Sequence, residues 1–144
     1  MGFQRVLIAV DDSPIAAHAA DTGIDIAHSM GAEVGFIYVR DAKRMNAPES
    51  GISAGEFAVW AEQEGKRLVA GFCRRMAPPS TALEFVEVGQ PAAKIVEAAK
   101  QWPASLIVIG SHGRTGITRI LLGSIAEGVI RHAPCPVLVV KAKD

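Results

Sequence analysis

The chain has 144 residues, 49% of them hydrophobic, and its 15 basic residues balance its 15 acidic ones. This length supports one self-sufficient core, and the apolar content excludes a disordered chain. The zero net charge gives no sign of a nucleic-acid partner or an anionic membrane surface, and no apolar run approaches the roughly 18 residues that span a bilayer. We therefore expect a single domain over residues 1–144, without nucleic-acid or membrane partners.

Two cysteines, Cys73 and Cys135, are too few for a disulfide framework or a metal site. We expect them to be reduced thiols, as is usual in the cytoplasm. The opening "MGFQRVLIAVDDS" lacks a signal-peptide core, because charge follows only five apolar residues. These observations predict a cytoplasmic protein that supplies no metal-ligand cluster of its own.

The first half of the chain begins with an apolar strand expected at residues 6–10. A helix is expected next, which Ser13 can cap and Gly31 ends. A second strand is expected at 33–39. Residues 41–54 have no apolar periodicity and are expected to form a long loop.

The second half continues the alternation of helices and strands. A helix is expected over 55–76, with candidate core contacts at Phe57, Trp60, Leu68 and Phe72. The run "ALEFVEV" at 82–88 alternates apolar and polar residues, which suits an edge strand with one wetter face. The remaining elements are expected to be a helix at 91–101, a strand at 105–110, a helix at 123–133 and a strand at 136–141.

This alternation predicts an α/β fold, a five-stranded parallel sheet with helices on both faces. A long excursion through the second and third strands before the fourth predicts the strand order 3-2-1-4-5. Ligands of such sheets bind beyond the carboxyl ends of the strands, where the order reverses. The reversal falls between the first and fourth strands, which end in "AVDDS" and "IGSHG".

The segment after the fourth strand, "GSHGRTGITRILLGS", carries glycines at a distinctive spacing, Gly110-x2-Gly113-x9-Gly123-Ser124. The first two glycines can form a tight turn whose backbone approaches a ligand closely. Gly123-Ser124 opens a helix, whose free N–H groups and dipole favour an anion. The pattern is neither a Walker A loop, which needs Gly-Lys-Ser/Thr, nor a Rossmann fingerprint, which would follow the first strand.

The spacing, the opening "VLIAVDDSPIAAHAA" and the ending "HAPCPVLVV" together resemble the universal stress protein family, in its ATP-binding branch. The resemblance covers the whole chain and implies a Rossmann-like fold of the adenine nucleotide alpha hydrolase-like type. It also implies a protein that binds ATP with Mg²⁺. Nucleotide occupancy would set its conformation or its choice of protein partner in adaptation to stress.

The resemblance also assigns nucleotide contacts to positions of this chain. It implies that Asp11, flanked by Ala9 and Val10, lies near the nucleoside. Val39 matches the position that lines the adenine pocket and meets the base through its backbone. The ribose and phosphate loop and the phosphate-binding helix start are matched by Gly110, His112, Gly113, Arg114, Gly123, Ser124 and Ile125.

Several of these residues have an alternative interpretation without a ligand. Ser124-x-x-Glu127 is a capping box, which needs no phosphate. Asp11 could be a turn residue beside Asp12, and the glycines could serve turns alone. Gly128 stands out for another reason, because a glycine inside a helix costs about 1 kcal/mol relative to alanine.

Two other functions remain as alternatives to a nucleotide-binding regulator. The first is a slow ATPase or nucleotidyl-transfer enzyme on the same scaffold. No nucleophile–base pair or paired carboxylates are visible in the sequence, so we expect no catalytic residues and at most slow hydrolysis. The second is a ligand-free dimer that serves as a scaffold, which would not need the glycine spacing.

The last strand, "PVLVVK", is short, apolar and at the sheet edge in the predicted order. An exposed apolar edge invites pairing with another chain. We expect a homodimer through strand 5 about a two-fold axis, an arrangement common in the resembled family. The alternative is a monomer in which "KAKD" and a neighbouring helix shield this edge.

Overall fold

The computed structural model describes residues 2–44, 53–76, 82–112 and 122–142. One parallel sheet in the order β3-β2-β1-β4-β5 organises these residues. Its strands are β1 (Arg5–Ala9), β2 (Glu33–Asp41), β3 (Leu83–Gly89), β4 (Leu106–Gly110) and β5 (Val137–Val140). The predicted fold class and strand order are therefore confirmed.

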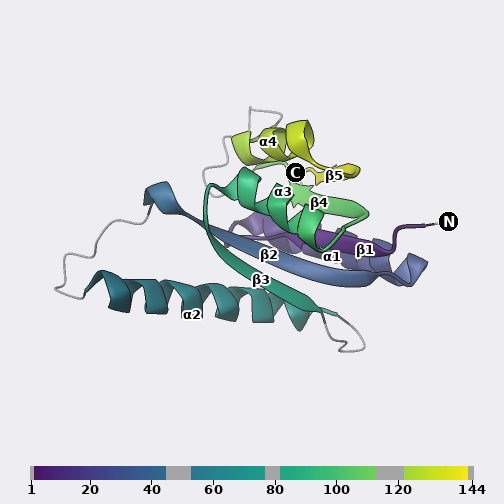
Figure 1. Cartoon of the computed structure of the whole chain (residues 1–144). Coiled ribbons are helices and arrows are strands. Elements are labelled where there is room, and N and C mark those ends of the chain that lie inside the picture. Colours follow the sequence, from purple (N-terminus) through teal and green to yellow (C-terminus); the bar gives the residue numbers. More distant parts are fainter. Residues whose placement is uncertain (1, 45–52, 77–81, 113–121, 143–144) are drawn as a thin grey trace.

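Helices cover both faces of the sheet (Figure 1). The α-helices of the described residues are α1 (Pro14–Met30), α2 (Ala54–Cys73), α3 (Pro91–Gln101) and α4 (Ser124–His132). One apolar cluster joins α1 and α2 to one face, and a second joins α3 and α4 to the other. The reversal of the strand order lies between β1 and β4, as expected.

After Arg5, the residues of β1 are apolar without interruption because the strand is covered on both faces. Val6 and Ile8 belong to the cluster beneath α1 and α2, whereas Leu7 and Ala9 belong to the cluster beneath α3 and α4. Alternate side chains of a strand point to opposite faces, so a strand covered on both faces has no position for a polar residue. Strand β3, at the edge, instead has only exposed and partly buried residues, and they occur in pairs rather than in the strict alternation that its sequence predicts.

Helix α1 begins and ends as its sequence predicts. Ser13 is its N-cap residue, although the Ser13 side chain makes no capping hydrogen bond, and Pro14 occupies the first turn. Gly31 ends the helix in the left-handed conformation, with φ 63°. Glycine adopts this conformation without steric cost, which explains the residue type at this position.

Strand β2 and helix α2 differ from the expected boundaries. Strand β2 continues to Asp41 and a 3₁₀ turn, η1 (Ala42–Arg44), follows, where a loop over 41–54 was expected. Pairing with β3 extends the strand as far as Asp41 opposite Gly89. Helix α2 starts after Ser53, whose Oγ accepts a hydrogen bond from the Glu56 amide at 3.0 Å, and ends at Cys73.

Two predicted core contacts on α2, Phe57 and Trp60, are wrong. Trp60 has 48% of its surface exposed, because the N-terminal part of α2 extends beyond the sheet (Figure 1). Phe57, which is partly buried, packs against Trp60 rather than the sheet, with ring centroids 5.6 Å apart. Farther along α2, Phe72 does contact the core, stacking on Phe36 at 6.2 Å.

Gly128 allows α3 and α4 to pack closely. A Cβ atom at this position would lie 2.8 Å from the Ala92 Cβ. Close packing therefore accounts for a glycine that helix propensity alone disfavours.

The substitution Gly128→Ala is expected to lower the free energy of unfolding by about 1 kcal/mol. Alanine gains helix propensity, but overpacking a well-packed contact typically costs about 1–3 kcal/mol. Gly71→Ala, in α2, is the matched control, because a Cβ there meets only the tip of Arg74 at 3.7 Å. Urea denaturation should show Gly71→Ala equal to or more stable than wild type, and a stabilised Gly128→Ala would contradict the packing explanation.

Both cysteines are free thiols that are partly buried. Burial, with a further effect of the Glu84 carboxylate, raises the pKa of the Cys73 thiol to about 11. Burial also raises the pKa of the Cys135 thiol. The thiolate is the reactive form, so neither residue is an activated nucleophile at neutral pH.

Candidate functional site

A pocket of about 500 Å³ opens at the carboxyl edge of the sheet. Its walls come from the ends of β1, β2 and β4 and from the N-terminal turns of α1, α3 and α4. The volume lies within the usual range for small-molecule sites, roughly 300–1,000 Å³. The pocket therefore lies at the reversal of the strand order, where the fold class places its ligands.

The pocket gathers predicted site residues from four separate segments. Those that line it are Ala9, Val10, Asp11, Val39, Gly110, His112, Gly123, Ser124 and Ile125. The predicted contacts Gly113 and Arg114 lie outside the described residues. The fold thus brings distant parts of the sequence together at one place, although their contact with a ligand remains a prediction.

The sequence left two roles open for Asp11, that of a turn residue and that of a nucleoside contact. The structure shows the turn role, and it leaves one carboxylate oxygen without a partner among the described residues. Asp11 Oδ1 accepts a hydrogen bond from the Ser13 amide at 2.9 Å and a short one from the Ser13 hydroxyl. The Ser13 side chain is occupied in this way, which explains why it does not cap α1. Within the described part of the chain, Asp11 Oδ2 has no hydrogen-bond partner and remains available to a ligand.

Ser111 fixes the end of β4, and sequence reasoning missed it. Its amide donates to Val140 O at 2.8 Å, and its carbonyl accepts from the Gly123 amide at 2.6 Å. The Ser111 side chain is buried, and its hydroxyl lies 2.9 Å from His112 Nδ1. A serine between two motif residues could have signalled this role, but the bonds come from segments far away in the sequence.

Gly123 owes its residue type to the close approach of two backbones. Its φ of −72° is open to any residue. A Cβ atom at Gly123 would lie only 2.9 Å from the Ser111 carbonyl oxygen. The glycine therefore lets the start of α4 pack directly against the end of β4.

The start of α4 presents to the pocket amides that have no acceptor among the described residues. Gly123 is the N-cap residue and has no side chain that could cap the helix. The expected capping box with Ser124 as its cap is therefore wrong, because Ser124 is already inside the helix, and Glu127 pairs with Arg131 at 2.9 Å. The amides of Ser124, Ile125 and Ala126 have no acceptor within the helix, since the first intrahelical bond is donated by Glu127.

The end of β2 adds residues that the sequence analysis did not consider. Arg40, Asp41 and Lys43 line the pocket beside the predicted Val39. Asp41 Oδ1 accepts a hydrogen bond from the Lys43 amide at 2.9 Å, which closes the turn after the strand. Their places at the end of a central strand are the only sequence signal for this role.

Over residues 2–44, 53–76, 82–112 and 122–142, no group of three or more His, Cys, Asp or Glu side chains is arranged to hold a metal ion. No helix in these ranges has both the length and the apolar character required to cross a bilayer.

The parallel sheet and its pocket at the strand-order reversal define a Rossmann-like α/β protein. The chain belongs to the universal stress protein family, whose family model, described as "Universal stress protein family", matches residues 2–141. It is 40% identical over 145 residues to Universal stress protein MJ0531 of Methanocaldococcus jannaschii, covering 96% of this chain and 82% of that protein. It is 30% identical to Universal stress protein YxiE of Bacillus subtilis, covering 96% of this chain and 99% of that protein.

Solved structures of the same fold include the hypothetical protein MJ0577, with a TM-score of 0.87 and 28% identity over 100% of this chain and 99% of that one. A universal stress protein in complex with cAMP has a TM-score of 0.69 at 24% identity, covering 97% of this chain and 98% of that one. One from Archaeoglobus fulgidus in complex with dAMP has a TM-score of 0.60 at 24% identity, covering 98% of this chain and 100% of that one. The last two likenesses concern the fold alone.

Proposed function

We propose that this chain binds an adenine nucleotide, ATP with Mg²⁺, in the pocket at the carboxyl edge. Occupancy of the pocket then sets the conformation or the partner choice of a cytoplasmic regulator of stress adaptation. The observation that carries the proposal is the uncapped start of α4, where the amides of Ser124, Ile125 and Ala126 meet the pocket. Unpaired helix amides and the helix dipole together favour phosphate.

The walls of the pocket differ along its length in a way that suits a nucleotide. Ile37, Val39 and Ile95 provide apolar surface near β2 and α3, which suits a purine base. The amides of α4 lie at the β4 side, which suits phosphates. The two free thiols fit a reducing compartment such as the cytoplasm.

The carboxylates after β1 fit the Mg²⁺ that accompanies ATP. Proteins usually hold this ion through one or two carboxylates together with the phosphates of the substrate. Asp11 and Asp12 line the pocket, and Asp11 Oδ2 has no partner within the described residues. When bound, the ion would neutralise phosphate charge beside these carboxylates.

Two solved proteins of this fold support an adenine nucleotide as the ligand class. One is a universal stress protein in complex with cAMP, and the other is in complex with dAMP. The proposal for this chain rests on its own pocket, where the amides of α4 and the glycine at its start are found.

Calorimetry with ATP, AMP and adenosine in the presence of Mg²⁺ tests the phosphate assignment. We expect ATP to bind roughly tenfold or more tightly than adenosine, with AMP between them, because hydrogen bonds to charged groups contribute about 1.5–3 kcal/mol. Equal affinities for ATP and adenosine would show that α4 does not receive the phosphates. Nucleotide released from the purified protein by denaturation and identified by mass spectrometry gives an independent readout.

We further propose that two copies associate through β5. This strand lies at the edge of the sheet, pairing on one side with β4. Val137, Leu138 and Val139 remain only partly buried in the single chain. A second copy meeting β5 about a two-fold axis would satisfy its free backbone groups and cover these side chains.

The substitution Val139→Lys is expected to convert the dimer to a monomer in sedimentation velocity experiments at tens of micromolar protein. A charge introduced at a paired apolar edge must be desolvated when two copies meet. Val59→Lys adds the same charge at an exposed position of α2, which packs against β2 and β3 at the other end of the sheet, and it should leave the dimer intact. A wild-type protein that stays monomeric at these concentrations would contradict the proposal.

A further inference from the structure

Arg40 occupies an unusual position at the pocket. It follows Val39 at the end of β2 and is one of the residues that line the pocket. Its guanidinium carbon lies 5.9 Å from the ring centroid of Tyr38 and 5.5 Å from that of Trp60. Two aromatic rings from β2 and α2 therefore hold the charged group in one place, each through a cation–π contact.

One N–H group of the guanidinium, that of Nε, has no acceptor among the described residues. This Nε atom is buried. An aromatic ring attracts the positive charge but offers no lone pair to this N–H group. Folded proteins leave few buried donors unpaired, because a donor without an acceptor, above all a charged one, loses its hydration without compensation.

Asp41 and Asp11, two carboxylates that line the pocket, do not supply the acceptor. The neighbouring Asp41 uses its Oδ1 to accept a hydrogen bond from the Lys43 amide. Asp11, across the pocket, accepts from Ser13. No ion pair links either carboxylate to Arg40 in the described part of the chain.

We propose that Arg40 is a ligand contact, which donates a hydrogen bond from Nε to an acceptor atom of the bound nucleotide. This inference rests on the proposed nucleotide site and extends it to the β2 end of the pocket, opposite the α4 amides. An acceptor there is a ring nitrogen, a ribose oxygen or a phosphate oxygen of the ligand. The guanidinium reaches it in a fixed orientation because Tyr38 and Trp60 already order the side chain, so little freedom is lost on binding.

The contact has a spectroscopic consequence because Trp60 touches the same guanidinium. A ligand that accepts a hydrogen bond from Arg40 changes the electrostatic surroundings of the half-exposed Trp60 indole. The other tryptophan, Trp102, packs against Phe85, with ring centroids 5.9 Å apart, and it does not line the pocket. Ligand-dependent emission is therefore expected to come from Trp60, and Trp60→Phe should abolish it.

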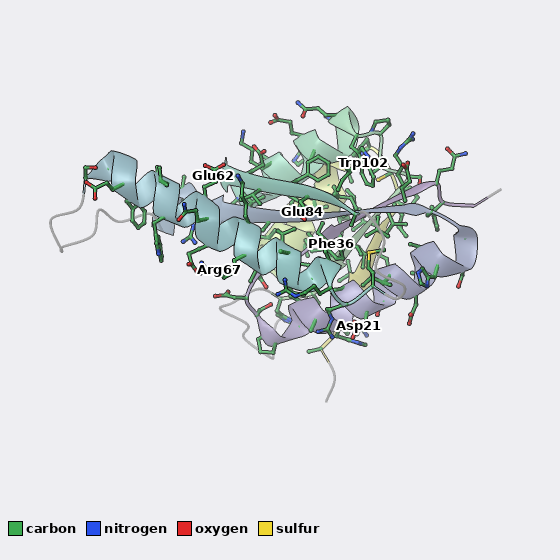
Figure 2. All side chains as sticks on the ribbon, turned by 90° about the horizontal axis from the view of Figure 1, so that it is seen from below. Asp21, Phe36, Glu62, Arg67, Glu84 and Trp102 are labelled. Atoms are coloured by element: carbon green, nitrogen blue, oxygen red, sulfur yellow. The ribbon has the colours of Figure 1, made fainter. Side chains whose placement is uncertain are left out.

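The binding test compares Arg40→Gln and Arg40→Lys with the wild type by calorimetry with MgATP. Losing a hydrogen bond from a charged donor is expected to weaken binding about tenfold or more in Arg40→Gln. Arg40→Lys keeps the charge but lacks the Nε donor, so it is expected to recover only part of the affinity. Arg67→Gln, on the outer face of α2 (Figure 2), removes the same charge away from the pocket and should bind as wild type.

The outcomes separate this inference from the proposed function. Tenfold weaker binding in Arg40→Gln, together with an emission change that Trp60→Phe removes, supports the contact. Wild-type affinity in Arg40→Gln with no emission change on saturation overturns it and leaves the nucleotide site intact. No binding of MgATP by the wild-type protein overturns both. Circular dichroism checks that each variant is folded. If Arg40→Gln does not fold, the affinity of Arg40→Lys still tests the contact.

Discussion

Replacement of Gly123 by valine is expected to weaken ATP binding by at least about tenfold while the sheet remains folded. Any Cβ at this position meets the Ser111 carbonyl oxygen at 2.9 Å, and a β-branched side chain enlarges the conflict. The start of α4 must then move away from β4, which displaces the amides of Ser124 and Ile125 from the pocket. Calorimetry with MgATP measures the loss, and circular dichroism verifies the fold.

Gly71→Val is the matched control for this substitution. It places the same side chain on α2, where a Cβ has only the distant tip of Arg74 within reach, and Gly71 does not line the pocket. Its affinity for ATP is expected to equal that of the wild type. Unchanged binding in a folded Gly123→Val variant would show that Gly123 serves the turn alone.

The second large effect is expected in the core. Phe36 on β2 is fully buried, with 0% of its surface exposed, on the face of the sheet that α2 covers (Figure 2). Phe36→Ala removes the ring and its stack on Phe72, and it leaves a cavity between β2 and α2. Such substitutions typically lower the free energy of unfolding by about 3–5 kcal/mol.

Urea denaturation measures this loss. Val59→Ala is the control, because Val59 lies on α2 with 55% of its surface exposed and should change stability by less than about 0.5 kcal/mol. A Phe36→Ala variant that loses less than about 1 kcal/mol would mean that the cavity collapses and that α2 contributes little to the core.

The sheet could be predicted because its signals are local or follow from chain order. Alternate burial of β1 on two faces leaves an uninterrupted apolar run in the sequence, and the connection lengths dictate the strand order. Ser13, Pro14 and Gly31 mark the ends of α1 through their own backbone preferences. Gly110 and Gly123 of the glycine spacing line the pocket, at the end of β4 and the start of α4.

The features that could not be predicted depend on contacts between distant segments. Trp60 has the spacing of a core residue, but its exposure follows from how far α2 extends past the sheet. Ser124 has the pattern of a cap, but the Gly123 carbonyl accepts the first intrahelical hydrogen bond from Glu127, while the Gly123 amide bonds to Ser111 in a distant segment, so Gly123 is the N-cap residue. The position of Arg40 between two aromatic rings requires α2 to lie beside β2.

Ser111 also joins two surfaces that have so far been considered separately. Its amide bonds to Val140 at the end of β5, the proposed dimer edge, and its carbonyl bonds to Gly123 at the proposed phosphate site. The backbone of one buried residue is therefore hydrogen-bonded to both the proposed dimer edge and the proposed phosphate site. If pairing through β5 shifts this residue and thereby changes the affinity for nucleotide, thermodynamic linkage requires nucleotide to change the affinity between protomers by the same factor. Nucleotide binding and dimerisation would then be coupled through the backbone of a single residue, Ser111.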